Sequence, residues 1–96
     1  MMRTYYQVNP NFVTREIAGE VLVVPVGEQT VKLNGMVTFN EVGAFLWKLL
    51  ENKATKEELV QQLVEEYQVG FEEVEADVEA FLAKAIKKEL INVLVI

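Results

Sequence analysis

The 96-residue sequence contains no cysteine and no histidine. The absence of cysteine excludes disulfides, cysteine-based zinc sites and a thiol nucleophile, and it is compatible with a reducing compartment. The absence of histidine removes the most frequent general base and the most frequent metal ligand of proteins. We therefore expect no catalytic residues, no metal site and no cofactor, and we predict that the chain is not an enzyme.

Basic residues and long apolar runs are also scarce. Lys and Arg number 9 against 15 Asp and Glu, which gives a net charge of −6, and no basic run is longer than Lys87-Lys88. Because nucleic-acid binding relies on Lys and Arg contacts to phosphate, we predict no nucleic-acid partner. No segment approaches the length of a membrane span, and residues 1–12 do not resemble a signal peptide. The expectation is a cytoplasmic protein with no membrane partner.

The remaining composition is typical of one globular domain. Apolar residues make up 51% of the chain and charged residues 25%, and this length accommodates a single hydrophobic core. We treat residues 1–96 as one domain with a loosely held lead-in at residues 1–11. The apolar tail at residues 91–96 suits either a short strand or a hydrophobic flap.

The part of the chain after the lead-in predicts three strands. Residues 12–17 and 20–24 favour a β-hairpin with a two-residue turn between them. Pro25 cannot donate to a ladder and is expected to end the second strand. Residues 29–33 alternate polar and apolar side chains, which predicts a third strand.

The second half of the chain predicts three helices. The first spans about residues 40–51 and begins at a cap formed by Thr38 or Asn40. The second begins at a capping box made by Thr55 and Glu58, and the third spans about residues 71–89. Strands followed by helices predict an α+β fold, in which a three-stranded antiparallel sheet is followed by a three-helix bundle in a winged helix-turn-helix-like arrangement.

A winged helix-turn-helix-like arrangement often binds DNA. The residues of the third predicted helix argue against this function. A recognition helix carries Arg, Lys, Asn or Gln toward the base edges. Carboxylates that would repel phosphate instead fill its first half. We interpret them as a solvated helix start that favours the helix dipole, and they are Glu72, Glu73, Glu75, Asp77 and Glu79.

Two aromatic residues need an interpretation. Phe39 directly precedes the expected cap and could staple the chain against the first helix. Trp47 lies off the apolar stripe of that helix, so it could mark a contact surface. The alternative, which we favour, is that its ring covers an edge of the core while its N–H bonds to water.

The predicted third strand is a candidate binding element. If residues 29–33 lie at the edge of the sheet, their free backbone groups could pair with an extended peptide. Alternatively, Lys32 and the short length of the strand protect this edge. The residues themselves leave both interpretations open.

The order of several motifs resembles the PqqD family. The resemblance covers nearly the whole chain and includes NP-x-F, REIAGE, LNG, N-E-x-G-A-F-L-W, T-x-E-E-L and V-x-x-D-V-x-x-F-L. It implies a domain that binds the leader segment of a ribosomally synthesised, post-translationally modified peptide. It also implies a partner enzyme that modifies this precursor peptide, often a radical S-adenosylmethionine (SAM) maturase.

The resemblance further implies where the leader binds. In this family the leader adds a strand to the sheet, in the groove between the third strand and the third helix. Lysines on the helix would suit acidic leader positions, although the flank of the helix that faces the strand stays open. The implied peptide-binding residues are Gln29, Thr30, Val31, Lys32 and Leu33 on the strand, and Phe81, Lys84 and Lys88 on the helix.

The sequence leaves alternatives open for the tail, the oligomeric state and the function. Family members commonly end soon after the third helix, so the tail at 91–96 could lie on the free edge strand or swap into a neighbouring chain. The sequence therefore leaves open whether the protein forms a homodimer. The rival functions are a winged-helix DNA-binding regulator and a docking subunit of a larger enzyme that binds no peptide.

Overall fold

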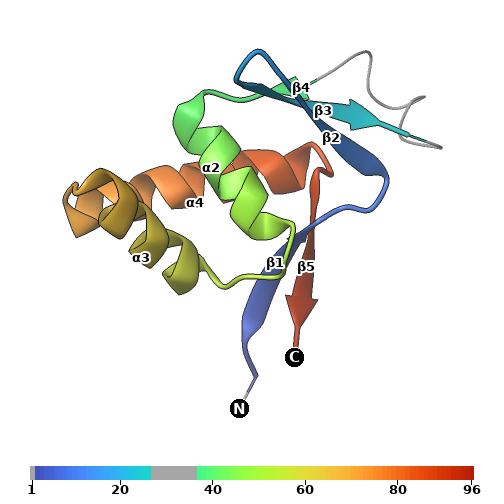
Figure 1. Ribbon diagram of the computed structural model, residues 1–96. Helices are drawn as coiled ribbons and strands as arrows, with labels where there is room; N and C mark the ends of the chain where they lie inside the picture. Colours follow the sequence, from blue (N-terminus) through green and yellow to red (C-terminus); the bar gives the residue numbers. More distant parts are fainter. Residues whose placement is uncertain (1, 27–36) are drawn as a thin grey trace.

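The computed structural model describes residues 2–26 and 37–96, which form an α+β fold with three helices and two small antiparallel sheets (Figure 1). The three helices pack together on one side. The larger sheet lies above them in Figure 1, and a two-stranded ribbon runs downward to both chain termini. The prediction of an α+β fold is thus confirmed.

The larger sheet has the strand order β2-β3-β4. Strands β2 (Phe12–Ile17) and β3 (Glu20–Pro25) form the predicted hairpin. Its turn residues Ala18 and Gly19 both have positive φ, 53° and 83°, as a two-residue hairpin turn of type I′ requires. Pro25 is the last residue of β3, as expected.

The third strand of this sheet, β4 (Val37–Thr38), pairs with Leu22 and Val23 of β3. The strand predicted at residues 29–33 lies outside the described residues. Within the described part of the chain, β4 therefore forms one edge of the larger sheet and β2 forms the other.

The helices begin at the caps that the sequence indicates. Helix α2 (Glu41–Leu50) starts at Asn40, whose side chain accepts a hydrogen bond from the Gly43 N–H at 2.7 Å. Helix α3 (Lys56–Tyr67) starts at the capping box, since Thr55 and Glu58 exchange hydrogen bonds of 3.1 and 2.9 Å. Helix α4 spans Phe71–Lys87. The three predicted helices are confirmed to within about two residues at each end.

The prediction of a loose lead-in is wrong, because Thr4–Val8 forms strand β1 and pairs with strand β5 (Ile91–Val95). The tail is therefore a strand, one of the two forms expected, but it pairs with β1 instead of the larger sheet. Asn9, buried next to β1, helps to fix this arrangement by donating its side-chain amide to the Glu89 carbonyl at 3.0 Å. The two segments are distant in sequence, so no local pattern could reveal that they pair.

The core lies between the helices and β3, and Trp47 is its largest fully buried side chain. Its indole N–H donates to the Thr14 hydroxyl at 2.8 Å, which joins α2 to β2. The interpretation of Trp47 as a contact surface is wrong, because the ring is 0% exposed. Its N–H is bonded to Thr14, whereas the favoured interpretation expected water.

Candidate functional site

A groove of about 210 Å³ lies between α4 and the start of α2, directly after β4. One wall is the C-terminal half of α4, and the other is the turn into α2. Its position next to an edge strand and along a helix is the arrangement that peptide-binding domains use for strand addition. The residues that line it are Phe39, Asn40, Gly43, Phe81, Lys84, Ala85, Lys88 and Leu90.

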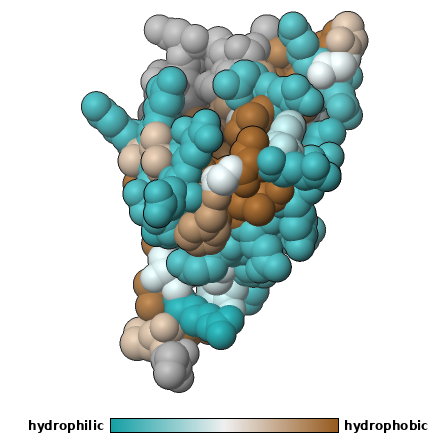
Figure 2. All heavy atoms as spheres, turned by 90° about the vertical axis from the view of Figure 1, so that its left-hand side faces the viewer, coloured by the Kyte–Doolittle hydropathy of each residue, from teal (hydrophilic) through white to brown (hydrophobic). Residues whose placement is uncertain are grey.

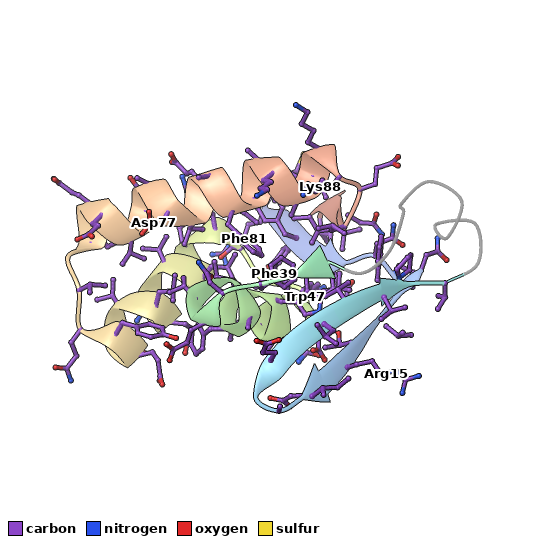
Figure 3. The ribbon with its side chains drawn as sticks, turned by 90° about the horizontal axis from the view of Figure 1, so that it is seen from above. Arg15, Phe39, Trp47, Asp77, Phe81 and Lys88 are labelled. Atoms are coloured by element: carbon purple, nitrogen blue, oxygen red, sulfur yellow. The ribbon has the colours of Figure 1, made fainter. Side chains whose placement is uncertain are left out.

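Aromatic rings form the inner end of this groove. The Phe39 ring centroid lies 5.5 Å from that of Phe81 and 5.3 Å from that of Trp47. Figure 3 shows Phe39 and Phe81 meeting between α4 and α2, with Trp47 next to them. Phe39 and Phe81 are both half-buried and packed against the core. They therefore offer an apolar contact surface that the core holds in place.

Gly43 allows Phe39 to lie this close to α2. A Cβ atom at Gly43 would be 3.1 Å from the Phe39 Cβ and 3.1 Å from the Asn40 Oδ1. These distances are shorter than ordinary van der Waals contacts, so a side chain here would displace Phe39 or the helix cap. The sequence suggested Phe39 only as a staple and did not indicate that Phe39 and Gly43 line a groove. A glycine in the first turn of a helix, close to an aromatic residue, was the available signal.

The groove is positively charged, whereas the first half of α4 is negatively charged. Among the described residues, Lys84 and Lys88 line the groove, and no carboxylate does. Within the described residues neither lysine has an ion-pair partner. The groove can therefore attract an acidic ligand with two lysines that are not already neutralised.

In the acidic first half of α4, by contrast, one carboxylate is already paired with a lysine. Glu79 accepts a hydrogen bond of 2.8 Å from Lys56 of α3, and this bond raises the pKa of the Lys56 ammonium. A second groove of about 450 Å³ lies between these two helices and is lined by Val60, Val64 and Phe71, with carboxylates around it. On the face of the molecule seen in Figure 2, hydrophobic side chains gather at the centre and hydrophilic ones surround them. The acidic groove touches neither β4 nor the aromatic pair of the first groove.

A larger hollow, of about 610 Å³, lies between β1 and the start of α3 and is open to solvent. It is lined mostly by polar side chains and is remote from the edge of the larger sheet. Size alone therefore does not identify the functional site. The smaller groove beside β4 combines an edge strand, aromatic rings and unpaired lysines.

The structure brings together the three helical residues that the sequence analysis selected. Phe81, Lys84 and Lys88 lie on one flank of α4 and line the same groove. That flank faces Phe39, the residue after β4. The strand residues Gln29, Thr30, Val31, Lys32 and Leu33 lie outside the described residues, so their role stays a prediction.

In residues 2–26 and 37–96, no helix is long and apolar enough to cross a membrane. No group of three or more acidic side chains is placed there to hold a metal ion.

The fold and the groove define a small α+β domain in which a groove lies between a helix and the edge of a sheet. Residues 19–91 match the model of a family described as coenzyme PQQ synthesis protein D (PqqD). The chain belongs to this family. PqqD-like domains are non-catalytic and bind peptides, which agrees with the prediction that the chain is not an enzyme.

Two solved structures are similar to the chain. One is TbiB1 in complex with the TbiA(beta) leader peptide, with a TM-score of 0.76 and 28% identity, and the match covers 90% of this chain and 94% of that one. The other is lasso peptide synthetase B1 complexed with the leader peptide. Its TM-score is 0.74, and the match covers 91% of this chain and 96% of that one; at 15% identity it supports the fold alone. No curated protein matches the chain.

Proposed function

We propose that this protein binds the leader segment of a ribosomally synthesised precursor peptide and presents it to a modifying enzyme. The observation that carries the proposal is the groove beside β4, with an aromatic pair at one end and two unpaired lysines along its wall. Family membership supports it, as does the likeness to TbiB1, a chain whose structure contains a leader peptide.

The leader would bind as an additional strand on the outer edge of the larger sheet. Backbone groups of residues 29–33 and of β4 would supply the ladder hydrogen bonds, and such bonds accept any sequence. Selectivity would then come from side chains that reach the groove. An apolar leader residue would contact Phe39 and Phe81, and this contact would bury part of both rings.

Charge would add a second level of selectivity. Lys84 and Lys88 are one helical turn apart, so acidic leader residues that follow the apolar one could reach them. Both lysines are exposed, so they would favour acidic leaders mainly through the association rate and the salt dependence of binding.

The test is a titration of the ¹⁵N-labelled protein with the short peptide encoded nearest its gene, followed by NMR. We expect the amide shifts to concentrate on residues 29–33, 37–39 and 81–88. Shifts confined to the acidic groove between α3 and α4 would contradict the proposal, as would no shifts at saturating peptide.

A proline at position 31 tests strand addition directly. Pro removes a backbone donor and is poorly tolerated in a paired strand. If residues 29–33 form the ladder, Val31→Pro should lower leader affinity sharply in a protein that is still folded. Unchanged affinity would argue against strand addition.

The modifying enzyme is expected to be a radical SAM maturase. This protein, as a winged helix-turn-helix-like domain, would be the peptide-binding partner of that enzyme. Co-purification of the tagged protein with the maturase encoded beside it, with and without the leader, tests this pairing. The DNA-binding alternative predicts gel-shift binding that falls steeply with salt. The carboxylates of α4 make that outcome unexpected.

A further inference from the structure

The ribbon formed by β1 and β5 has one closed edge and one open edge. At the closed edge, Tyr6 of β1 exchanges two backbone hydrogen bonds with Ala54, of 2.8 and 3.0 Å. At the open edge, no strand of the described chain lies beside β5. Figure 1 shows this ribbon leaving the body of the molecule, with both termini at its far end.

The hydrogen-bond pattern indicates which groups of β5 face the open edge. Arg3 and Ile96 exchange backbone bonds of 2.7 and 2.9 Å, so they form a hydrogen-bonded pair. Such pairs alternate along an antiparallel ladder, so Leu94 and Asn92 also point their backbone groups toward β1. The N–H and C=O of Val93 and Val95 must then point outward. The Tyr6–Ala54 bridge supports this assignment, because Tyr6 is opposite Val93 and its groups point away from β5.

Within the described residues these outward groups have no hydrogen-bond partner. The side chains beside them are also exposed, 46% for Val93 and 57% for Val95. Residues 91–96 contain no charge, no proline and no glycine. Charged side chains and proline are two of the features with which proteins protect an edge strand, and β5 has neither.

A two-stranded ribbon is marginal by itself, and a third or fourth strand stabilises it substantially. We propose that β5 pairs with β5 of a second copy of this chain, which joins two ribbons into one four-stranded antiparallel sheet. The proposal is independent of leader binding, because the ribbon and the groove beside β4 use different strands.

A second copy suits this edge better than another partner for two reasons. Antiparallel pairing of a strand with its own copy forms a closed two-fold dimer. In addition, β5 carries no charge that its copy would repel, although the whole chain has a net charge of −6. With the two-fold axis at Val93, the outward groups of Val93 face those of Val93 in the copy, and Val95 faces Ile91.

Opposite charges at position 93 provide a sharp test. Like charges directly opposed across a ladder are destabilising, and opposite charges are favourable. We expect the unmodified protein to approach twice the monomer mass by sedimentation equilibrium as its concentration rises from micromolar to millimolar. Val93→Lys and Val93→Glu should each lower the dimerisation affinity about tenfold or more, and an equimolar mixture of the two should restore a dimer.

The matched control is Val13→Lys, which makes the same substitution at an exposed position on β2, an edge strand of the other sheet. It should leave the dimer unchanged. Hydrogen exchange adds a readout at the residue itself, because the Val93 amide should become protected as the protein concentration rises.

Three results would overturn the proposal. They are a monomer at millimolar concentration, a dimer that both charge variants leave intact, and a mixture of the variants that stays monomeric. Protection of the Val93 amide by the leader peptide, without a rise in mass, would assign the edge to the peptide instead. Near-ultraviolet circular dichroism of each variant would show that it is folded.

Discussion

In the part of the chain that the structure describes, each of the two sheets ends in an open edge, and the surroundings of the two edges differ. The edge at β4 lies beside a groove with two phenylalanines and two lysines. The edge at β5 projects from the body with an uncharged strand and no helix alongside its outer end. Backbone groups are the same at both edges, so the neighbouring side chains must decide which partner each edge accepts.

A third edge, at β2, shows what a protected edge looks like. It carries Arg15 and Glu16, and Glu16 also pairs with Lys48 of α2 at 3.2 Å. Charges on an edge strand oppose pairing with other chains. On the two proposals above, the β4 edge receives a foreign peptide and the β5 edge a second copy, whereas the charges of β2 oppose both.

The largest effect should come from the residue that holds the larger sheet on the helices. Trp47→Ala removes the largest buried side chain and should lower the free energy of unfolding by about 3–5 kcal/mol, measured by urea denaturation. Thr14→Val is the control, because it removes only the acceptor of the indole N–H and should lower stability by about 1–3 kcal/mol. Equal losses in the two variants would mean that the ring contributes little beyond its hydrogen bond.

The next largest effect tests which of the two grooves on α4 binds the leader. Phe81→Ala should weaken leader binding by about tenfold or more, because the contact with Phe39 in the groove is lost. Phe71→Ala makes the same change on the same helix at a side chain that is 59% exposed and outside this groove. Isothermal titration with the leader should show normal affinity for Phe71→Ala. A larger loss for Phe71→Ala would move the binding site to the acidic groove.

Charge reversal should have a smaller effect. Lys88→Glu should weaken binding of an acidic leader by about 1 kcal/mol, since exposed charges contribute at most about that much. Lys87→Glu gives the same change in net charge one residue away, outside the groove lining, and should have little effect. The difference between the two should shrink as salt rises. A difference that salt does not alter would exclude an electrostatic role for Lys88.

The grouping of the three helical candidate residues could be predicted because it depends on local spacing. Phe81, Lys84 and Lys88 share a flank of one helix, and the helical period reveals this without a structure. The contributions of Phe39 and Gly43 could not be predicted in this way, since both reach the groove through packing between separate elements. For the same reason β1 was missed, because its partner β5 lies at the other end of the chain.

Trp47 illustrates a different limit of sequence patterns. The apolar stripe of α2 describes the face toward the other helices, and Trp47 lies off it. Strand β2 covers that second flank, and Thr14 accepts the indole N–H there. The position of a strand over a helix is set by the tertiary structure, so periodicity alone assigned Trp47 to the edge of the core.

The smallest predicted effect tests whether the groove depends on the position of Phe39. In Gly43→Ala, the better helix propensity of alanine, up to about 1 kcal/mol, would offset the crowding of Phe39 and the Asn40 cap. We therefore expect nearly unchanged stability by urea denaturation, together with a loss of leader affinity of about threefold, or about 0.6 kcal/mol. Gly70→Ala is the control, because no atom lies within 4 Å of the added Cβ, and it should leave affinity unchanged. If Gly43→Ala lowers stability but not affinity, Phe39 supports the helix cap and does not contact the leader.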